Sequence, residues 1–257
     1  MTQPNRFALT VDLLAQLDEG HASVPAASPS LPTLNDVLAE YSPLPRAALF
    51  LGVANDGLPV LLNLLDPVPG PILIVGDAEA GKTRLLQMIA RSLAKADSTS
   101  NIRYGVLTPR PEDWQSLQPM DDRCDGILSP GDSAASNYLN ALVNWGHENK
   151  GENQIVVLLM DQLDACVAAD SLKQSLPWLF LRGPSRRIWP VVTMNPAHAR
   201  NVSSWLDSFH TRLFGCMSNA EASAFAGNSL VNSQDLIRGS QFVLREGNNW
   251  LPFWIPR

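Results

Sequence analysis

The sequence of 257 residues predicts an α/β fold in which a mostly parallel sheet is flanked by helices. Three observations carry this prediction. Short apolar runs alternate with amphipathic segments along the chain, as is typical of parallel α/β sheets. One apolar run leads directly into a glycine-rich loop, and a helical pattern follows that loop. Hydrophobic residues make up 45% of the chain and charged residues only 17%, which allows a sizeable core.

We expect the chain to form two parts, an N-terminal helical extension over residues 1–45 and one domain over residues 46–257. Residues 6–19 carry apolar side chains at helical spacing. Residues 21–32 are rich in Ala, Ser and Pro, which is typical of a linker. The helix on this tether either docks on a partner or a neighbouring subunit, or folds back on its own domain.

The segments before the main sheet predict a short helix and a β-hairpin. The helix is expected over residues 34–40, with Thr33 or Asn35 as its N-cap. Two apolar runs, residues 48–53 and 59–64, then flank an Asn-Asp-Gly turn signal, which is typical of a hairpin.

The parallel sheet is expected to begin after this hairpin. Its strands are predicted at residues 72–75, 102–107, 126–128, 155–160, 188–194, 211–217 and, as the last strand, 241–244. Its helices are predicted at residues 82–95, 136–147, 172–181, with an interruption at Pro177, and 220–226. Aromatic residues that follow are expected to cover an edge or face of the sheet, or else to bind a partner; they are Trp250, Phe253 and Trp254.

The loop at residues 76–83 reads Gly-Asp-Ala-Glu-Ala-Gly-Lys-Thr and has the spacing of a phosphate-binding P-loop. Glycines let the backbone wrap closely around a phosphate, and the helix that follows adds the positive end of its dipole. Lys82 is expected to bind the β- and γ-phosphates, and Thr83 to give Mg²⁺ a hydroxyl ligand. The predicted cofactor-binding residues are Gly76, Asp77, Ala78, Glu79, Ala80, Gly81, Lys82, Thr83 and Arg84. Glu79 is expected to face solvent, because it would otherwise repel the γ-phosphate.

A second nucleotide motif is the apolar run at residues 155–160, which ends in Asp161. A carboxylate at the end of a buried strand is expected beside the P-loop, where Thr83 and Asp161 form the predicted Mg²⁺ site. The sequence therefore predicts ATP and Mg²⁺ as cofactors. ATP is favoured over GTP because the chain has no Asn-Lys-x-Asp guanine signature.

Gln162 follows Asp161 at the position where many ATPases carry a glutamate that activates the attacking water. An amide has no useful basicity at neutral pH, although it can orient water by hydrogen bonding. Three outcomes stay open: no hydrolysis, slow hydrolysis, or rescue by another carboxylate. Asp164 is the nearest carboxylate in sequence. It shares the face of Gln162 on an extended segment but not on a helical turn.

Asn195 ends a predicted strand immediately before Pro196. In ring ATPases a polar residue at this place senses the γ-phosphate or the attacking water, so the candidate catalytic residues are Lys82, Gln162 and Asn195. The alternative for Asn195 is a turn at the strand end. The sequence does not single out an arginine that would act on a neighbouring subunit; the candidates are Arg182, Arg186, Arg187, Arg200 and Arg212.

Composition narrows the class of protein and its setting. A net charge of −6 with a pI near 5.2 excludes a basic field over the whole chain that would attract nucleic acid. Three cysteines at wide spacing predict neither a metal site nor a disulfide framework. No stretch approaches 18 uninterrupted apolar residues and the first residues do not form a signal peptide, so we expect a cytoplasmic protein without membrane insertion.

Four stretches resemble the FtsK/SpoIIIE–HerA class of P-loop translocases. Residues 50–60 are similar to the lead-in Gly-x-x-x-x-Gly-x-Pro of that class, and residues 161–164, Asp-Gln-Leu-Asp, to its Asp-Glu-Leu-x-Asp. Residues 190–196 resemble its strand that ends in Thr-Gln-x-Pro. Residues 211–213 through 238–242 resemble its closing strands with a Gly-Arg-Gly pattern. The resemblance spans about residues 48–245.

The resemblance implies a RecA-like P-loop NTPase fold and a homo-oligomer, usually a hexameric ring, or a place in a larger ATPase assembly. Members of the class move DNA or polypeptide through the pore. The chain departs from the class at Gln162 and at residues 77–80, which replace a Gly-Ser run. Three functions stay open: a motor subunit for translocation, a degenerate nucleotide-binding subunit that regulates or scaffolds a larger machine, and a nucleotide switch.

Overall fold

The computed structural model describes residues 31–96, 101–117, 122–149, 154–218, 220–221, 225, 233–246 and 249–257. The chain divides into two compact units, Met1–Leu31 and Pro32–Arg257, and all the elements named below belong to the second unit. The helix predicted at residues 6–19 and most of the predicted linker lie outside the described residues.

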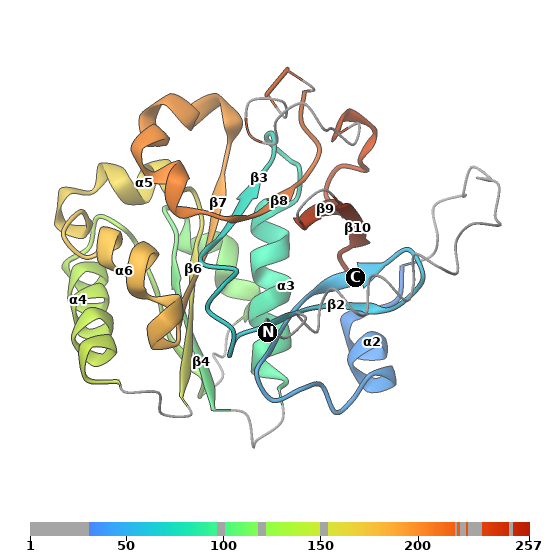
Figure 1. Cartoon of the computed structure of the whole chain (residues 1–257), viewed down its shortest axis with the longest axis horizontal. Coiled ribbons are helices and arrows are strands. Elements are labelled where there is room, and N and C mark those ends of the chain that lie inside the picture. Colours follow the sequence, from blue (N-terminus) through green and yellow to red (C-terminus); the bar gives the residue numbers. More distant parts are fainter. Residues whose placement is uncertain are drawn as a thin grey trace, which may run out of the picture. The chain divides into compact units, whose positions relative to one another are not determined.

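Ten strands form one sheet in the order β2-β1-β10-β9-β8-β3-β7-β6-β4-β5 (Figure 1). They are β1 (Ala48–Ala54), β2 (Pro59–Asn63), β3 (Ile72–Val75), β4 (Ile102–Leu107), β5 (Cys124–Leu128), β6 (Ile155–Met160), β7 (Ile188–Met194), β8 (Thr211–Phe214), β9 (Gln241–Glu246) and β10 (Asn249–Trp254). Pairing is parallel from β8 through β3, β7, β6 and β4 to β5, and antiparallel from β8 through β9, β10 and β1 to β2. The predicted α/β architecture with a mostly parallel sheet is confirmed.

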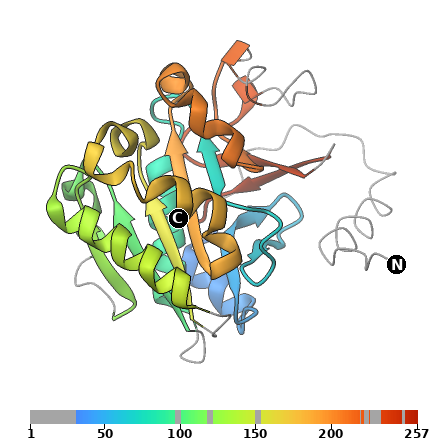
Figure 2. The same ribbon diagram turned by 60° about the vertical axis from the view of Figure 1, so that its left-hand side comes forward.

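Helices cover both faces of this sheet (Figures 1 and 2). The α-helices are α2 (Leu34–Glu40), α3 (Lys82–Ala94), α4 (Ser133–Glu148), α5 (Leu163–Ala168) and α6 (Leu176–Arg182). The 3₁₀ segments are η1 (Pro111–Leu117), η2 (Asp170–Leu172), η3 (Pro184–Arg186), η4 (Pro196–Ser208) and η5 (Ser233–Asp235). The apolar side chains of α2 and α3 belong to one core cluster, and those of α4, α5 and α6 to another.

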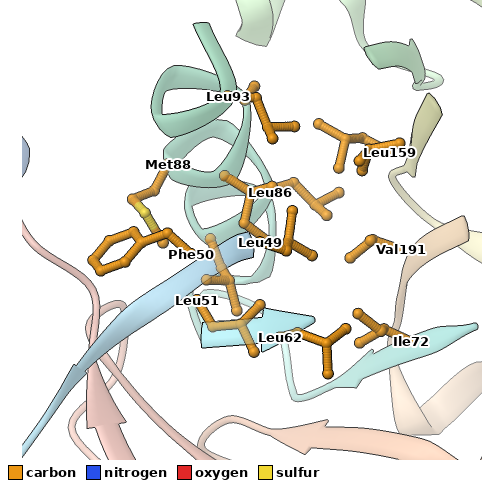
Figure 3. Close-up of a cluster of buried hydrophobic side chains, with 14 of the residues drawn as sticks. Leu49, Phe50, Leu51, Leu62, Ile72, Leu86, Met88, Leu93, Leu159 and Val191 are labelled. Carbon is orange, nitrogen blue, oxygen red and sulfur yellow. The ribbon is translucent and has the colours of Figure 1, made fainter. Parts of the chain in front are cut away.

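The two clusters follow from the alternation of side chains along a strand. In β3, Ile72 and Ile74 lie in the cluster with α3, whereas Leu73 and Val75 lie in the cluster with α4 to α6. Every residue of β6 and β7 is buried, as expected for strands covered on both faces. Figure 3 shows part of the first cluster, with the labelled residues Leu49, Phe50, Leu51, Leu62, Ile72, Leu86, Met88, Leu93, Leu159 and Val191.

Local chemistry accounts for the first elements of this unit. Thr33, and not Asn35, caps α2: its hydroxyl accepts from the N–H of Asp36, and the carboxylate of Asp36 accepts from the N–H of Thr33, both at 3.2 Å. In the hairpin β1–β2, Asp56 Oδ1 accepts from the N–H of Leu58 at 2.9 Å, which is a typical turn contact of aspartate.

Two sequence predictions about the later elements are wrong. Pro177 does not interrupt a helix but lies in the first turn of α6. Backbone N–H groups in the first turn of a helix have no acceptor within the helix, so a proline there costs no hydrogen bond. The last strand is β10 and not β9, and Trp250, Phe253 and Trp254 belong to β10. These aromatic residues therefore form a strand between β9 and β1 instead of a segment that covers the sheet. Their side chains still pack on its faces, since Phe253 is buried in the cluster with α3 and Trp250 packs against the cluster with α4 to α6.

Smaller differences concern the ends of elements. Helix α4 begins three residues before its predicted start, and β8 ends at Phe214, because residues from Gly215 onward turn toward the loop after β3. The helix predicted at residues 220–226 lies largely outside the described residues. Within the part of the chain that the structure describes, no helix is both long enough and apolar enough to cross a membrane.

Candidate functional site

The P-loop joins the carboxyl end of β3 to the start of α3 (Figure 1). Strand β7 and the residues after β8 hold its first residues. The N–H of Gly76 donates to the carbonyl of Met194 at 3.3 Å, and the N–H of Asp77 donates to that of Cys216 at 3.0 Å. Gly81 precedes α3 with a φ of 94°, in the left-handed region that favours glycine. The sequence thus produces the predicted order of strand, glycine-rich loop and helix.

The ammonium group of Lys82 lies over this loop. It donates to the carbonyl oxygens of Gly76 at 2.7 Å and of Asp77 at 2.6 Å. Burial lowers the pKa of Lys82, while the negative charges of Asp161, Asp77 and Asp164 oppose that shift. A partly buried cation is thus held where a phosphate bound in the loop would meet it.

Asp161 is almost wholly buried at the end of β6, where two hydroxyl groups donate to its carboxylate. Thr83 Oγ1 lies 3.1 Å from Oδ1 and 3.0 Å from Oδ2 of Asp161. Thr193 Oγ1 donates to Oδ1 at 2.7 Å and accepts from the N–H of Gln162 at 2.8 Å. The two predicted metal ligands, Thr83 and Asp161, are therefore in direct contact.

The remaining residues of the loop differ in exposure. Ala80 is buried, whereas Ala78 and Glu79 are exposed, and Glu79 thus faces solvent as predicted. Arg84 is exposed and leaves the loop, since its guanidinium donates to the carbonyl oxygens of Gly239 at 3.1 Å and Pro256 at 3.5 Å.

Gln162 takes an unusual backbone conformation for a residue with a side chain, with φ at 65° and ψ at 85°. It immediately precedes α5, so Asp164 lies in the first helical turn. Asp164 therefore does not share the face of Gln162, as expected for a helical turn. Its carboxylate instead contacts Nδ1 of His198 at 2.9 Å, which links α5 to η4.

Asn195 follows β7 and caps η4, because its Oδ1 accepts from the N–H of Ala197 at 3.0 Å. The polar residue of β7 that reaches Asp161 is Thr193, two residues earlier, which the sequence reasoning missed. One signal was available: Thr193 is the hydroxyl residue in a strand that is otherwise apolar.

The arginine candidates mostly bind backbone of their own chain. Arg186 donates to the carbonyl of Asn149 at 3.2 Å, and Arg187 to that of Leu65 at 2.8 Å. Arg212 donates to three carbonyls, at 2.8 to 3.1 Å. These contacts give the three arginines a role within the fold.

Arg238 also lies at the loop and was missed as a site residue. Its Nη1 donates to the carbonyl of Ala78 at 3.1 Å, and its Nη2 lies 3.8 Å from Oδ2 of Asp77. Burial and the nearby Glu221 raise the pKa of Asp77, whereas Arg238 and Lys82 act in the opposite direction. The carboxylate of Asp77 in the loop is thus paired with a cation that comes from outside the loop.

These residues fit a nucleotide with Mg²⁺. Lys82 provides the positive charge for phosphate, and Thr83 with Asp161 provides the hard oxygen ligands that Mg²⁺ prefers. Among the described residues, no group of three or more His, Cys, Asp or Glu is placed to hold a metal by itself. Thr83 and Asp161 would hold Mg²⁺ together with phosphate oxygens and water, as is usual for Mg²⁺ in nucleotide sites.

Comparisons with known proteins support the fold. No family model matches the chain, and no curated protein matches it. Among solved structures, Thermomonospora curvata EccC (ATPases 2 and 3) in complex with a signal sequence peptide matches with a TM-score of 0.69 and 15% identity, over 97% of this chain and 48% of that one. EssC (ATPases 2 and 3) from Geobacillus thermodenitrificans matches with a TM-score of 0.66 and 14% identity, over 91% and 48%.

A third match is the pCW3 conjugation coupling protein TcpA with ATPγS, with a TM-score of 0.67 and 15% identity, over 91% of this chain and 71% of that one. The chain spans about half the length of the EccC and EssC structures. At such low identity the likeness concerns the fold. The chain has the RecA-like fold of the FtsK/SpoIIIE-type P-loop ATPases, the class that its sequence motifs resemble.

Proposed function

We propose that the chain is an ATP-binding P-loop ATPase that hydrolyses ATP as a subunit of a ring-forming motor for translocation of DNA or polypeptide. The observation that carries the proposal is the contact between Thr83 and Asp161 beside the ammonium group of Lys82. This arrangement joins the two nucleotide motifs of the sequence at one edge of the sheet. It matches what binding of Mg²⁺ and a triphosphate requires.

Each of these residues has a specific task in the proposal. Lys82 exchanges its bonds to the carbonyls of Gly76 and Asp77 for bonds to phosphate oxygens. Thr83 and Asp161 hold Mg²⁺, which supplies positive charge at the phosphates when it is bound. Thr193 keeps the carboxylate of Asp161 in place through a hydrogen bond of 2.7 Å. Asn195 would sense the nucleotide only after releasing the N–H of Ala197.

Our proposals for the assembly and for the cargo rest on the similarity in fold to other ATPases, and not on the geometry of the site. EccC and EssC structures with ATPases 2 and 3 contain more than one ATPase module in a chain. We therefore expect this chain to work in a homo-oligomer or in a larger ATPase assembly. An EccC structure holds a signal sequence peptide, and the acidic pI of 5.2 disfavours DNA. Polypeptide is thus the better supported cargo, and the free cysteines Cys124, Cys166 and Cys216 suit a cytoplasmic setting.

A second candidate function is that of a degenerate nucleotide-binding subunit that regulates or scaffolds a larger machine. The observation in its favour is Gln162, which directly follows the metal ligand Asp161 and carries an amide where a general base is expected. Asp164 does not replace that base, because its carboxylate lies on a helical turn and contacts His198.

Steady-state ATP turnover of the purified protein, measured beside Lys82→Ala, tests the proposal. Turnover that disappears with Lys82 supports an active ATPase in which Gln162 is tolerated. Tight binding of nucleotide without turnover favours the degenerate subunit. Absence of both nucleotide binding and turnover in the wild-type chain would overturn the two candidate functions together. Nucleotide-dependent mass, followed by light scattering, then separates a ring from a monomeric switch.

A further inference from the structure

A segment outside the two nucleotide motifs lies against the P-loop. It consists of residues 236–240, which join η5 to β9. A Cβ atom on Gly81 would stand 2.8 Å from backbone atoms of Gly239, and Arg84 donates to the carbonyl of Gly239. At the other end of the loop, Arg238 donates to the carbonyl of Ala78. The segment therefore contacts both the start and the end of the phosphate-binding loop.

The P-loop carries a negative charge of its own, and residues 236–240 supply a cation that offsets it. Asp77 is part of the loop, so its carboxylate repels an incoming triphosphate. Glu221 lies near Asp77 and adds negative charge, and burial with this neighbour raises the pKa of Asp77. Arg238 is the ion-pair partner of Asp77, with Nη2 3.8 Å from Oδ2. The charge of Asp77 is thus offset by an arginine that lies far away in the sequence.

Arg238 also affects how the loop presents its backbone. The carbonyl of Ala78 and the N–H of Glu79 belong to one planar, trans peptide unit, so the two groups point in opposite directions. Arg238 holds that carbonyl toward itself with an exposed hydrogen bond of 3.1 Å. The N–H of Glu79 is thereby directed away from Arg238, where it can contribute to a cradle of N–H groups around a phosphate.

We propose that Arg238 is a positioning residue for nucleotide binding, which neutralises Asp77 and fixes the Ala78–Glu79 peptide so that the acidic loop accepts a triphosphate. The inference rests on the proposed nucleotide-binding function and goes beyond it, because it assigns a role to a residue outside both motifs. Arg238 is exposed; it acts through the loop and does not itself have to touch the nucleotide.

The test compares Mg²⁺·ATP affinity, measured by titration calorimetry, among the wild type and six variants of the full chain. The variants are Arg238→Ala, Arg238→Lys, Asp77→Asn, the double variant that combines Arg238→Ala with Asp77→Asn, Lys82→Ala and Arg91→Ala. Arg91 is the matched control, because it is an exposed arginine in the last turn of α3, at the opposite end of that helix from the P-loop. Loss of one partly screened charge pair at the phosphate site is expected to weaken binding about five- to twentyfold in Arg238→Ala.

The double variant provides the decisive readout. If Arg238 acts by neutralising Asp77, then Asp77→Asn recovers most of the loss caused by Arg238→Ala. The loss also shrinks as salt is added, since salt screens exposed charges. A purely structural role of Arg238 predicts neither effect. Asp77→Asn alone is expected to bind nucleotide at least as tightly as the wild type, and Arg238→Lys, which keeps the charge, to bind with intermediate affinity.

Other results overturn the proposal in distinguishable ways. If the wild type binds no nucleotide and equals Lys82→Ala, the proposed function itself fails. If the wild type binds and Arg238→Ala behaves like Arg91→Ala, only the role of Arg238 fails. Absence of any recovery in the double variant, or weaker binding by Asp77→Asn alone, also excludes neutralisation as its role. Urea denaturation of each variant shows whether the fold is intact, and Asp77→Asn and Arg238→Lys keep the test valid if Arg238→Ala does not fold.

Discussion

The hydroxyl of Thr83 donates to both carboxylate oxygens of Asp161, at 3.1 and 3.0 Å. Thr83 lies in the first turn of α3, and Asp161 directly follows β6. Thr193 of β7 donates to the same carboxylate. This hydrogen-bonded group occupies the place where Mg²⁺ would be coordinated. A bound metal would therefore exchange these hydrogen bonds between side chains for bonds to the ion.

Asp161→Asn is expected to remove the dependence of nucleotide binding on Mg²⁺ while leaving the fold intact. The amide oxygen can still accept from Thr193, but it brings no negative charge to the ion. Loss of a charged ligand should weaken binding of Mg²⁺·ATP about 10- to 100-fold, as for other charge-assisted contacts. Calorimetric titrations with and without Mg²⁺ measure this, with exposed Asp170→Asn as the control. Unchanged metal dependence would contradict the assignment of Asp161.

Gln162→Glu is expected to raise ATP turnover at least about tenfold, because it restores a general base at the position after Asp161. Gln162→Ala, which removes the amide without adding a base, serves as the matched control and should not exceed the wild-type rate. Steady-state kinetics at saturating Mg²⁺·ATP provide the measurement. An equal rate for Gln162→Glu and the wild type would show that the amide is not what limits hydrolysis.

The stability of the protein without nucleotide should depend on the charge of Lys82 at alkaline pH. Burial lowers the pKa of Lys82, so the folded chain holds this proton more weakly than the unfolded chain, whose lysines titrate at about 10.4. Between these two values the unfolded chain binds more protons, and the free energy of unfolding therefore rises with pH. Below the pKa of the folded state the lysine is charged in both states, and this gain is absent.

Lys82→Met lacks this titration, so its free energy of unfolding should not show the corresponding rise. Urea denaturation of the two proteins at a series of pH values, from neutral to about 10.4, measures the difference. The other lysines are common to both proteins and cancel in the comparison. Parallel curves for the wild type and Lys82→Met would mean that the fold does not disfavour the charge of Lys82.

Gly81→Ala is expected to destabilise the fold more than Gly57→Ala, although both glycines have a φ near 90°. At Gly57 a Cβ meets nothing within 4 Å, so only the strain of a positive φ remains, about 1 kcal/mol. At Gly81 the Cβ would also stand 2.8 Å from the backbone of Gly239, which brings the cost to about 2–4 kcal/mol. Urea denaturation gives the loss of unfolding free energy for each variant. Equal losses for Gly81→Ala and Gly57→Ala would indicate that the backbone at Gly239 can move away from the added Cβ without destabilising the fold.

Elements with strong local signals were predictable from the sequence. The strand, loop and helix around Lys82 follow from an apolar run, two glycines and a helical pattern that lie side by side in the chain. The buried strand β6 follows from its unbroken apolar run. Thr33 and Asp36 cap α2 within four residues of sequence. In each case the residues that determine the structure are neighbours along the chain.

Features that depend on distant residues were not predictable in the same way. Strand β10 contains Pro252, which argues against a strand inside a sheet, yet β10 pairs with both β9 and β1. The bond between Thr193 and Asp161 depends on the order of β7 and β6 in the sheet. Arg238 reaches Ala78 only because residues 236–240 lie against the P-loop. Sequence periodicity reports which residues are buried, but not which strands become neighbours.

The position of β10 in the sheet also determines which strands can pair while the chain is being synthesised. Strands β1 and β2 are made early, but Val53 and Ala54 reach the rest of the sheet by pairing with Trp254 and Phe253 of β10. In a ribosome-bound chain that lacks β10, strand β1 has no partner besides β2, and β9 keeps β8 but has lost its other neighbour. The exposed edges of β1 and β9 are available to chaperones, or to other nascent chains, until β10 is made and joins them.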